Sequence, residues 1–226
     1  WFSDNNVANL SWVFNKFDKL FKNKDWFYSW ANIRYFLYEY EQYISEWTWS
    51  NHKINPEEIF KKNDKDHVSI EHIYPQTPTD EYWINNFSVY TEEEKKRLTN
   101  SLWNLLPLSQ SINSSLQNYS FESKKFDSYK RRWYQNWSHS EIEVSKYSQW
   151  TPNEIKERWL KLVNFMEDRW NFIIQNDYER LKFLWLEFMA PEDDKVKNET
   201  MPVNIEKENI NNKKEESANA LSLWEG

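Results

Sequence analysis

Cysteine is absent from this sequence of 226 residues. Its absence excludes disulfide bonds, thiolate zinc sites and a cysteine nucleophile. Long apolar runs are also absent, since no stretch approaches the roughly 18 residues of a membrane span and no basic-then-apolar leader opens the chain. We therefore expect a soluble, cytoplasmic protein with one domain of ordinary size. Because the chain begins at Trp1 without a methionine, we interpret it as a fragment of a longer protein.

Glycine is nearly absent, whereas tryptophan is abundant. The chain has one glycine, Gly226, and fifteen tryptophans. Average usage would supply roughly 16 glycines, and turns and helix ends need glycine where φ is positive. We hypothesise that many of the tryptophans are misread glycine codons, as happens when UGA encodes glycine in the source and is translated as tryptophan. The alternative is a protein that is truly rich in tryptophan, and the codons distinguish the two.

The net charge of −7 argues, taken alone, against a nucleic-acid partner. The charge is unevenly distributed. Residues 95–132 hold eight bases and two acids, whereas residues 191–226 hold nine acids and five bases. The middle of the chain is therefore basic. The polar, charged composition from residue 191 onward predicts a disordered tail over 191–226.

Apolar residues recur at helical spacing on both sides of the centre. Helices are predicted over 25–47, over 152–170 and from 172 to 189. Capping patterns mark three helix starts, at Asn55-Pro56-Glu57-Glu58, Thr91-Glu92-Glu93-Glu94 and Thr151-Pro152-Asn153-Glu154. We expect a helical region over 1–60, a distinct core over 61–135 and a second helical region over 136–190.

Two short runs inside the core read as strands. In the first, from Asp66 to Ile73, Val68, Ile70 and His72 alternate with His67, Ser69 and Glu71. The second runs from Leu102 to Leu108 and leads into a short helix that Ser109 could cap. The expected centre is a strand–loop–strand–helix unit between helical flanks.

Side chains suited to acid–base chemistry or metal binding gather on this centre. Glu71 and His72 end the first strand, Asn104 opens the second, and Asn113 lies on the helix that follows. The set contains a general base and two oxygen donors suited to a hard cation such as Mg²⁺. Each residue alone has a plainer interpretation as a surface pair, a turn or a solvated face, and it is the order and spacing of the set that favour a site.

These residues resemble a known family. Glu71-His72-Ile73-Tyr74-Pro75-Gln76, then Ser101-Leu102-Trp103-Asn104-Leu105-Leu106-Pro107-Leu108, then Asn113, and then Phe121 with Lys124 resemble the HNH (His-Me finger, ββα-metal) nucleases. The pattern is similar to the C-terminal nuclease domain of GmrSD-type modification-dependent restriction enzymes. The motifs cover about 69–125, and the resemblance spans most of 25–175. It implies an α+β fold that is mainly α, with a small ββα-metal core over 61–135.

The resemblance also implies roles. His72 would deprotonate the attacking water, and Glu71 and Asn113 would hold one divalent cation, Mg²⁺ or Mn²⁺. Asn104 would brace the loop and orient the His72 ring. Lys124 would contact the scissile or a neighbouring phosphate, with Lys125 as its rival.

The implied partners are DNA, including modified foreign DNA, and an NTP-using N-terminal domain or subunit. This chain has no Walker-type loop, so that part is absent from it. The basic stretch Lys130-Arg131-Arg132 would neutralise the DNA backbone. No membrane partner is expected.

One departure from the family pattern leaves a second interpretation open. Trp103 stands where the family has glycine. A misread codon would explain it; if the tryptophan is real, the site is distorted or dead. The alternative function is therefore a catalytically inactive helical binding module on the nuclease scaffold. A zinc site formed by His67 and His72 is a third and weaker reading, since it lacks cysteine partners.

Overall fold

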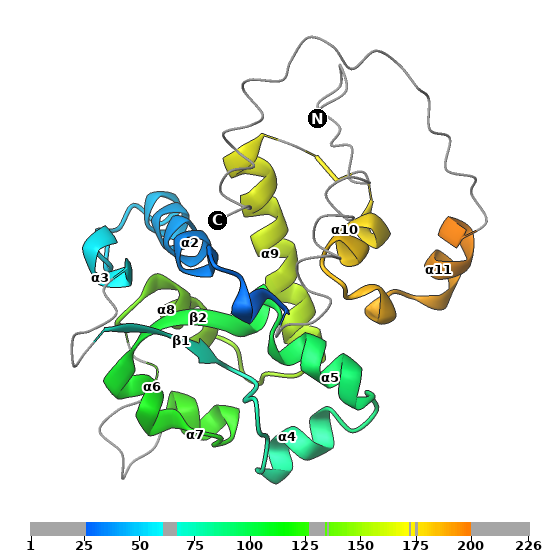
Figure 1. Cartoon of the computed structure of the whole chain (residues 1–226), viewed down its shortest axis with the longest axis horizontal. Helices are drawn as coiled ribbons and strands as arrows, with labels where there is room; N and C mark the ends of the chain where they lie inside the picture. The colour runs from blue at the N-terminus through cyan, green and yellow to red at the C-terminus, as the bar shows by residue number, and fades with distance from the viewer. Residues whose placement is uncertain are drawn as a thin grey trace. The chain divides into compact units, whose positions relative to one another are not determined.

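The structure is a computed structural model that describes residues 26–60, 67–126, 134, 136–171, 173–174 and 176–199 (Figure 1). The chain divides into two compact units, one formed by residues 21–165 and the other by residues 1–20 and 166–226. Both strands lie in the first unit. None of the described helices combines the length and the apolarity needed to cross a bilayer.

The larger unit is mainly helical. Its elements, in chain order, are η1 Trp26–Ser29, α2 Ile33–Trp47, α3 Pro56–Phe60, β1 Val68–His72, α4 Glu81–Asn86, α5 Glu92–Thr99, η2 Leu102–Asn104, β2 Leu105–Ser109, α6 Gln110–Leu116, α7 Phe121–Lys125, α8 His139–Ser145 and the greater part of α9 Pro152–Trp170. This confirms the expected α+β class with a helical majority. The metal-binding character of the ββα centre stays a prediction.

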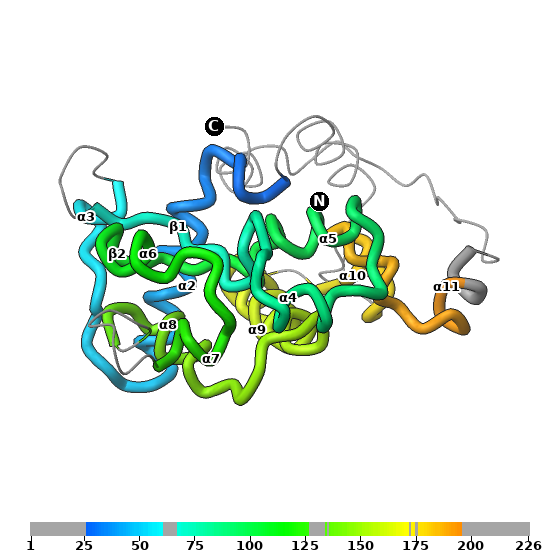
Figure 2. The backbone as a smooth tube through the Cα atoms, turned by 90° about the horizontal axis from the view of Figure 1, so that it is seen from below, coloured from blue at the N-terminus to red at the C-terminus, as the bar shows by residue number. Residues whose placement is uncertain are grey.

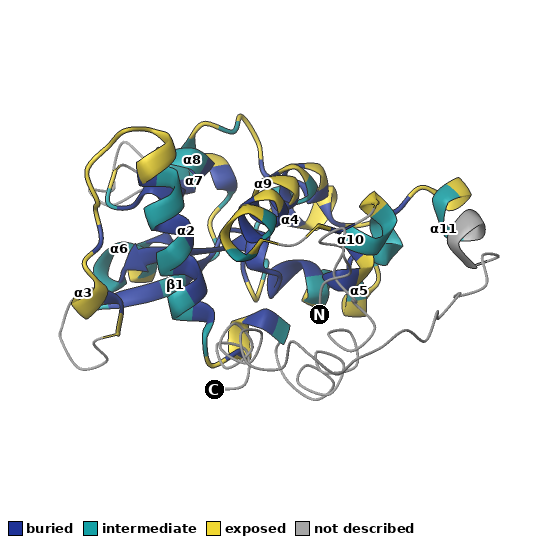
Figure 3. Cartoon of the chain, turned by 90° about the horizontal axis from the view of Figure 1, so that it is seen from above, coloured by how far each residue is buried: buried dark blue, intermediate teal, exposed yellow. Residues whose placement is uncertain are grey.

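The sheet consists of β1 and β2, which pair antiparallel with Val68 opposite Ser109 and His72 opposite Leu105. Helix α6 packs against both strands, and α2 and α8 contact β2 (Figure 2). Strand β2 is buried along its whole length, and β1, which Figure 3 labels, is buried at four of its five residues. Strand β2 begins at Leu105, three residues later than expected, because Leu102–Asn104 form a 3₁₀ turn in which the Asn104 amide donates to the Ser101 carbonyl.

Buried charges tie the helices to the sheet. The carboxylate of Glu41 on α2 accepts hydrogen bonds from the backbone amides of His139 and Ser140 at the start of α8, where the helix dipole favours a negative charge. Arg158 on α9 is fully buried and donates from Nη1 to the carbonyls of Trp103 and Leu105. The backbone that leads into β2 is thereby fixed from outside the sheet.

The aromatic stretch of α2 forms core. The helix buries Ile33, Phe36, Leu37 and Tyr40, and the rings of Phe36 and Phe165 lie 5.6 Å apart. The expected helix over 25–47 is thus present, although a 3₁₀ turn replaces its first residues. The capping box expected at Thr91 is also formed, with reciprocal hydrogen bonds between Thr91 and Glu94.

The described part of the smaller unit contains the end of α9 and the short helices α10 Asp177–Phe183, η3 Glu187–Met189 and α11 Glu192–Glu199. The single helix expected over 172–189 is wrong, because the Asn176 side chain caps a new helix by accepting a bond from the Glu179 amide. The expected disordered tail begins with α11, and residues 200–226 lie outside the described residues.

Tryptophan occupies backbone positions that favour glycine. Positive φ is found at five described non-glycine residues, and three of them are tryptophans, namely Trp26 at 49°, Trp49 at 51° and Trp185 at 56°. An L-residue in this region costs about 1–2 kcal/mol. The side chain of Trp49 is 97% exposed and so gains little packing in return. These positions favour the misread-codon hypothesis.

Other tryptophans are built into the core as tryptophans. Trp83 donates from its indole to the Tyr119 carbonyl at 2.9 Å, and Trp150 donates to Asn104 Oδ1 at 3.1 Å. Trp103 is as fully buried as these two, but its indole nitrogen has no hydrogen-bond partner among the described residues. The hypothesis therefore concerns a subset of the tryptophans, and Trp103 stays a candidate for that subset on the family pattern.

Replacing Trp49 with glycine is expected to stabilise the protein by about 1 kcal/mol, because glycine adopts positive φ without the steric cost. Thermal unfolding should show a rise in Tm of about 2–4 °C. The matched control is Trp47→Gly, which alters an exposed tryptophan inside α2 and stacked on Tyr43. The control should lower Tm, and a fall in Tm for both variants would contradict the hypothesis at this position.

Candidate active site

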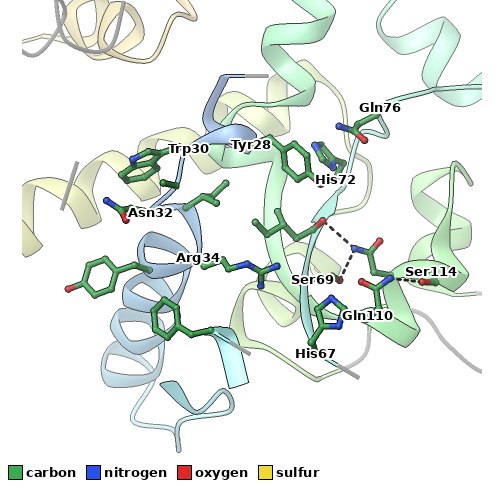
Figure 4. A pocket seen from close by; sticks show the side chains of 16 residues that line it. Tyr28, Trp30, Asn32, Arg34, His67, Ser69, His72, Gln76, Gln110 and Ser114 are labelled. Atoms are coloured by element: carbon green, nitrogen blue, oxygen red, sulfur yellow. Dashed lines mark hydrogen bonds between the residues drawn. The ribbon is translucent and has the colours of Figure 1, made fainter. Parts of the chain in front are cut away.

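A cavity of about 910 Å³ opens beside β1. Its size is near the upper end of the ~300–1,000 Å³ typical of ligand sites. Figure 4 shows side chains from η1, α2, β1 and α6 converging on it. The lining residues are Tyr28, Trp30, Ala31, Asn32, Ile33, Arg34, Tyr35, Phe60, His67, Ser69, Ile70, His72, Gln76, Gln110, Asn113 and Ser114.

The described lining residues of the cavity include no Asp or Glu. Their ionisable groups other than tyrosines are one guanidinium, Arg34, and two imidazoles, His67 and His72. The chain as a whole has a charge of −7, so a wall whose described residues lack carboxylates is a local departure from its composition. Such a wall suits an anionic occupant.

His72 ends β1 on this wall and is 8% exposed. Its Nε2 lies 3.2 Å from Oδ1 of Asn100, and its ring packs against Tyr28 with the ring centroids 4.4 Å apart. The amide group of Asn100 is oriented independently, because its Nδ2 donates to the Lys96 carbonyl. Oδ1 can only accept, so Nε2 carries the proton and the lone pair of the neutral ring is on Nδ1.

Asn104 holds the loop that follows His72. Its side chain accepts a hydrogen bond from the Tyr74 amide and donates to the carbonyls of Tyr74 and Thr99, each at 2.8 Å. Its own carbonyl accepts from the Ile73 amide at 3.0 Å. Asn104 thus braces this loop, and its role in the reaction stays a prediction. The expected contact with the His72 ring is made by Asn100 instead, and this corrects the ring-orienting part of the prediction.

Glu71 points into the protein interior toward Lys124. Lys124 Nζ lies 2.7 Å from Glu71 Oε1, and it also donates to the carbonyls of His72 at 2.8 Å and Ile73 at 3.0 Å. The Tyr134 hydroxyl donates to the same carboxylate oxygen at 3.0 Å. Burial raises the pKa of Glu71 and lowers the pKa of Lys124, and the attraction between the two groups partly offsets both shifts.

The two predicted metal ligands are differently placed. Asn113 lines the cavity and donates from Nδ2 to Ser69 Oγ at 2.8 Å and to the Ile70 carbonyl at 3.2 Å. Glu71 is not a lining residue, and its carboxylate is engaged by Lys124. These placements do not fit a cation held jointly by Glu71 and Asn113 unless the ion takes the place of the ammonium. In the described part of the chain, no group of three or more His, Cys, Asp or Glu side chains could hold a metal.

The predicted phosphate contacts are corrected in part. Lys124 is fully buried in its ion pair, so its ammonium is directed to Glu71 and away from solvent. Lys125 Nζ donates to the Tyr147 carbonyl at 2.6 Å and is likewise engaged by the protein. Lys130, Arg131 and Arg132 lie outside the described residues.

Sequence reasoning missed Arg34, Tyr28, Asn100 and Tyr134. Arg34 gave a usable signal, because it is the only Lys or Arg between residues 26 and 52. Asn100 and Tyr28 carried no local signal, since their contact with His72 depends on how α5 and η1 pack against the end of β1.

One comparison identifies a family. The model described as "GmrSD restriction endonucleases, C-terminal domain" matches residues 13–165. No match was found among curated proteins or among solved structures. The matched range contains β1, β2, α6 and every described residue that lines the cavity.

Substituting Lys124 with methionine should destabilise the protein by about 3–5 kcal/mol, because it leaves the buried Glu71 charge without its partner. Urea unfolding measures the change. Lys125→Met is the matched control, since the Lys125 ammonium donates to the backbone carbonyls of Tyr147 and Ser148 and lies over the Phe121 ring, with no carboxylate partner shown among the described residues. This variant should cost about 1 kcal/mol. Equal losses of unfolding free energy in the two variants would show that the Glu71–Lys124 ion pair contributes no more to stability than the hydrogen bonds of Lys125.

Proposed function

Since the chain belongs to the GmrSD restriction endonuclease C-terminal domain family, we propose that it hydrolyses phosphodiester bonds of DNA. The observation that carries the proposal is the placement of His72, whose ring is held at Nε2 on the wall of a cavity with no Asp or Glu among its described lining residues. A polyanion such as DNA suits that wall. Hydrolysis of a phosphodiester needs a general base next to the bound phosphate.

In the proposed mechanism, His72 accepts a proton at Nδ1 from a water molecule. The resulting hydroxide oxygen forms a bond to phosphorus, while the bond from phosphorus to the leaving oxygen breaks. Asn100 Oδ1 continues to accept the Nε2 proton, and this charge-assisted hydrogen bond stabilises the imidazolium that forms. Asn104 and Lys124 hold the backbone of residues 72–74 during the step.

Mg²⁺ or Mn²⁺ stays the proposed cofactor. When bound, such an ion stabilises negative charge on the phosphate and on the leaving oxygen. Asn113 is the predicted ligand that lines the cavity. Glu71 would become a ligand only by exchanging Lys124 for the metal, and no step above depends on that exchange.

We further propose that the activity serves restriction of modified foreign DNA, together with an NTP-using domain or subunit. This part of the proposal rests on the family, whose printed description is that of restriction endonucleases.

A second candidate is a catalytically inactive binding module. It is favoured by the engagement of Glu71 with Lys124 and by the buried indole of Trp103, whose nitrogen has no partner among the described residues. Cleavage by the unmodified protein separates the two candidates.

The protein is expected to nick plasmid DNA in Mg²⁺ or Mn²⁺, and His72→Ala should lower the rate by about 10²–10⁴-fold because the general base is lost. Gel analysis of supercoiled plasmid measures this. His52→Ala serves as the control, since His52 is exposed, hydrogen-bonds Ser45 of α2 and is not a lining residue. This variant should cleave normally. Equal cleavage by the unmodified protein and His72→Ala would contradict the assignment of His72 as general base. No cleavage by either protein would favour the binding module.

Asn100 should affect turnover through the orientation of His72. Asn100→Ala is expected to lower kcat about tenfold with little change in KM, because it removes an acceptor that the substrate does not touch. Asn100→Asp keeps an oxygen at the same position and should restore most of kcat. If alanine and aspartate lower kcat equally, the hydrogen bond to Nε2 is not what positions the ring.

A further inference from the structure

Arg34 is a charged residue on the cavity wall to which the reaction above gives no role. It lies on the first turn of α2 and lines the same cavity as His72. Figure 4 shows its side chain extending from α2 toward Ser69 on β1. A guanidinium in that place is a group suited to phosphate oxygens, because its planar donors match their geometry.

The Arg34 guanidinium is held in place by backbone groups. Its Nη1 donates to the carbonyl of Val68 at 2.5 Å and to the carbonyl of Ile59 at 3.2 Å. These two bonds use one nitrogen, and the described structure shows no carboxylate paired with the others. The guanidinium is therefore oriented before any ligand arrives, which lowers the entropy cost of binding.

The surroundings of Arg34 favour an anion. The side chain is partly buried, and burial lowers its pKa, so the charge lacks full solvation. An arginine that served only to join α2, α3 and β1 would need no cavity beside it whose described lining residues include neither Asp nor Glu. An anion in the cavity would supply the missing counter-charge.

We propose that Arg34 binds a phosphate of the DNA strand that occupies the cavity, next to the phosphodiester that His72 attacks. The proposal rests on the proposed function and adds a phosphate-binding residue to the same site. It replaces the role expected of Lys124, whose ammonium is buried against Glu71.

DNA binding in a cleavage-free background tests this. The parent protein carries His72→Ala and is measured with EDTA against a fluorescent duplex of about 20 base pairs, by anisotropy between about 50 and 200 mM salt. Arg34→Gln should weaken binding about tenfold at the lowest salt. It should also reduce the slope of log K against log salt by about 1, the value of one phosphate contact.

The control variant is Lys146→Gln. Lys146 is exposed at the end of α8 and does not line the cavity, so its loss changes net charge equally but should leave the slope unchanged. An Arg34→Gln slope and affinity equal to those of the parent would overturn the proposal. Cleavage by the protein with native His72 is a separate result, so this failure would leave the proposed function intact.

Arg34→Lys covers the case in which the glutamine variant unfolds. Lysine keeps the positive charge but lacks the planar fork, so the salt slope should match the parent while affinity falls by less than in Arg34→Gln. If the folded Arg34→Lys protein matches the parent in affinity as well as in slope, the planar donors of Arg34 make no phosphate contact, and the proposal is wrong.

Discussion

Two buried side chains fix the end of β1, and the geometry of the site depends on them. Lys124 donates to the carbonyls of His72 and Ile73, and Asn104 bonds both the amide and the carbonyl of Tyr74. The backbone from 72 to 74 would otherwise leave polar groups unpaired in the interior. Because these groups are satisfied from two different segments, the imidazole is presented to the cavity by a backbone that has little freedom to move.

The same arrangement divides the charges at the site. Glu71 and Lys124 neutralise each other in the interior, while Arg34, His67 and His72 line the cavity without a carboxylate among the described lining residues. An anionic substrate therefore meets a wall of neutral and positive groups, although the chain carries a net charge of −7. The division also sets a condition on metal binding, since a cation that used Glu71 would have to displace an ammonium that is already held by three oxygen atoms.

Local patterns predicted what depends on neighbours in sequence. The alternation around Ser69, the capping box at Thr91 and the run Glu71-His72 gave the first strand, a helix start and the family. What failed depends on partners distant in sequence. Lys124 lies 53 residues from Glu71 and Asn100 lies 28 from His72, and no spacing rule reports which cation is buried or which amide meets the ring. The helix expected across Asn176 failed for a local reason, because a capping asparagine outweighed a continuous apolar pattern.

The central claim is that the His72 ring is held with its proton on Nε2 and its lone pair on Nδ1. Nitrogen NMR of the imidazole, with selectively labelled histidine and His72→Ala to assign the signal, measures the tautomer directly. The account predicts a neutral ring protonated at Nε2, and that this preference is lost when Asn100 is replaced by alanine. A neutral ring protonated at Nδ1 in the native protein would contradict it, because the nitrogen proposed to take the proton from water would already carry one.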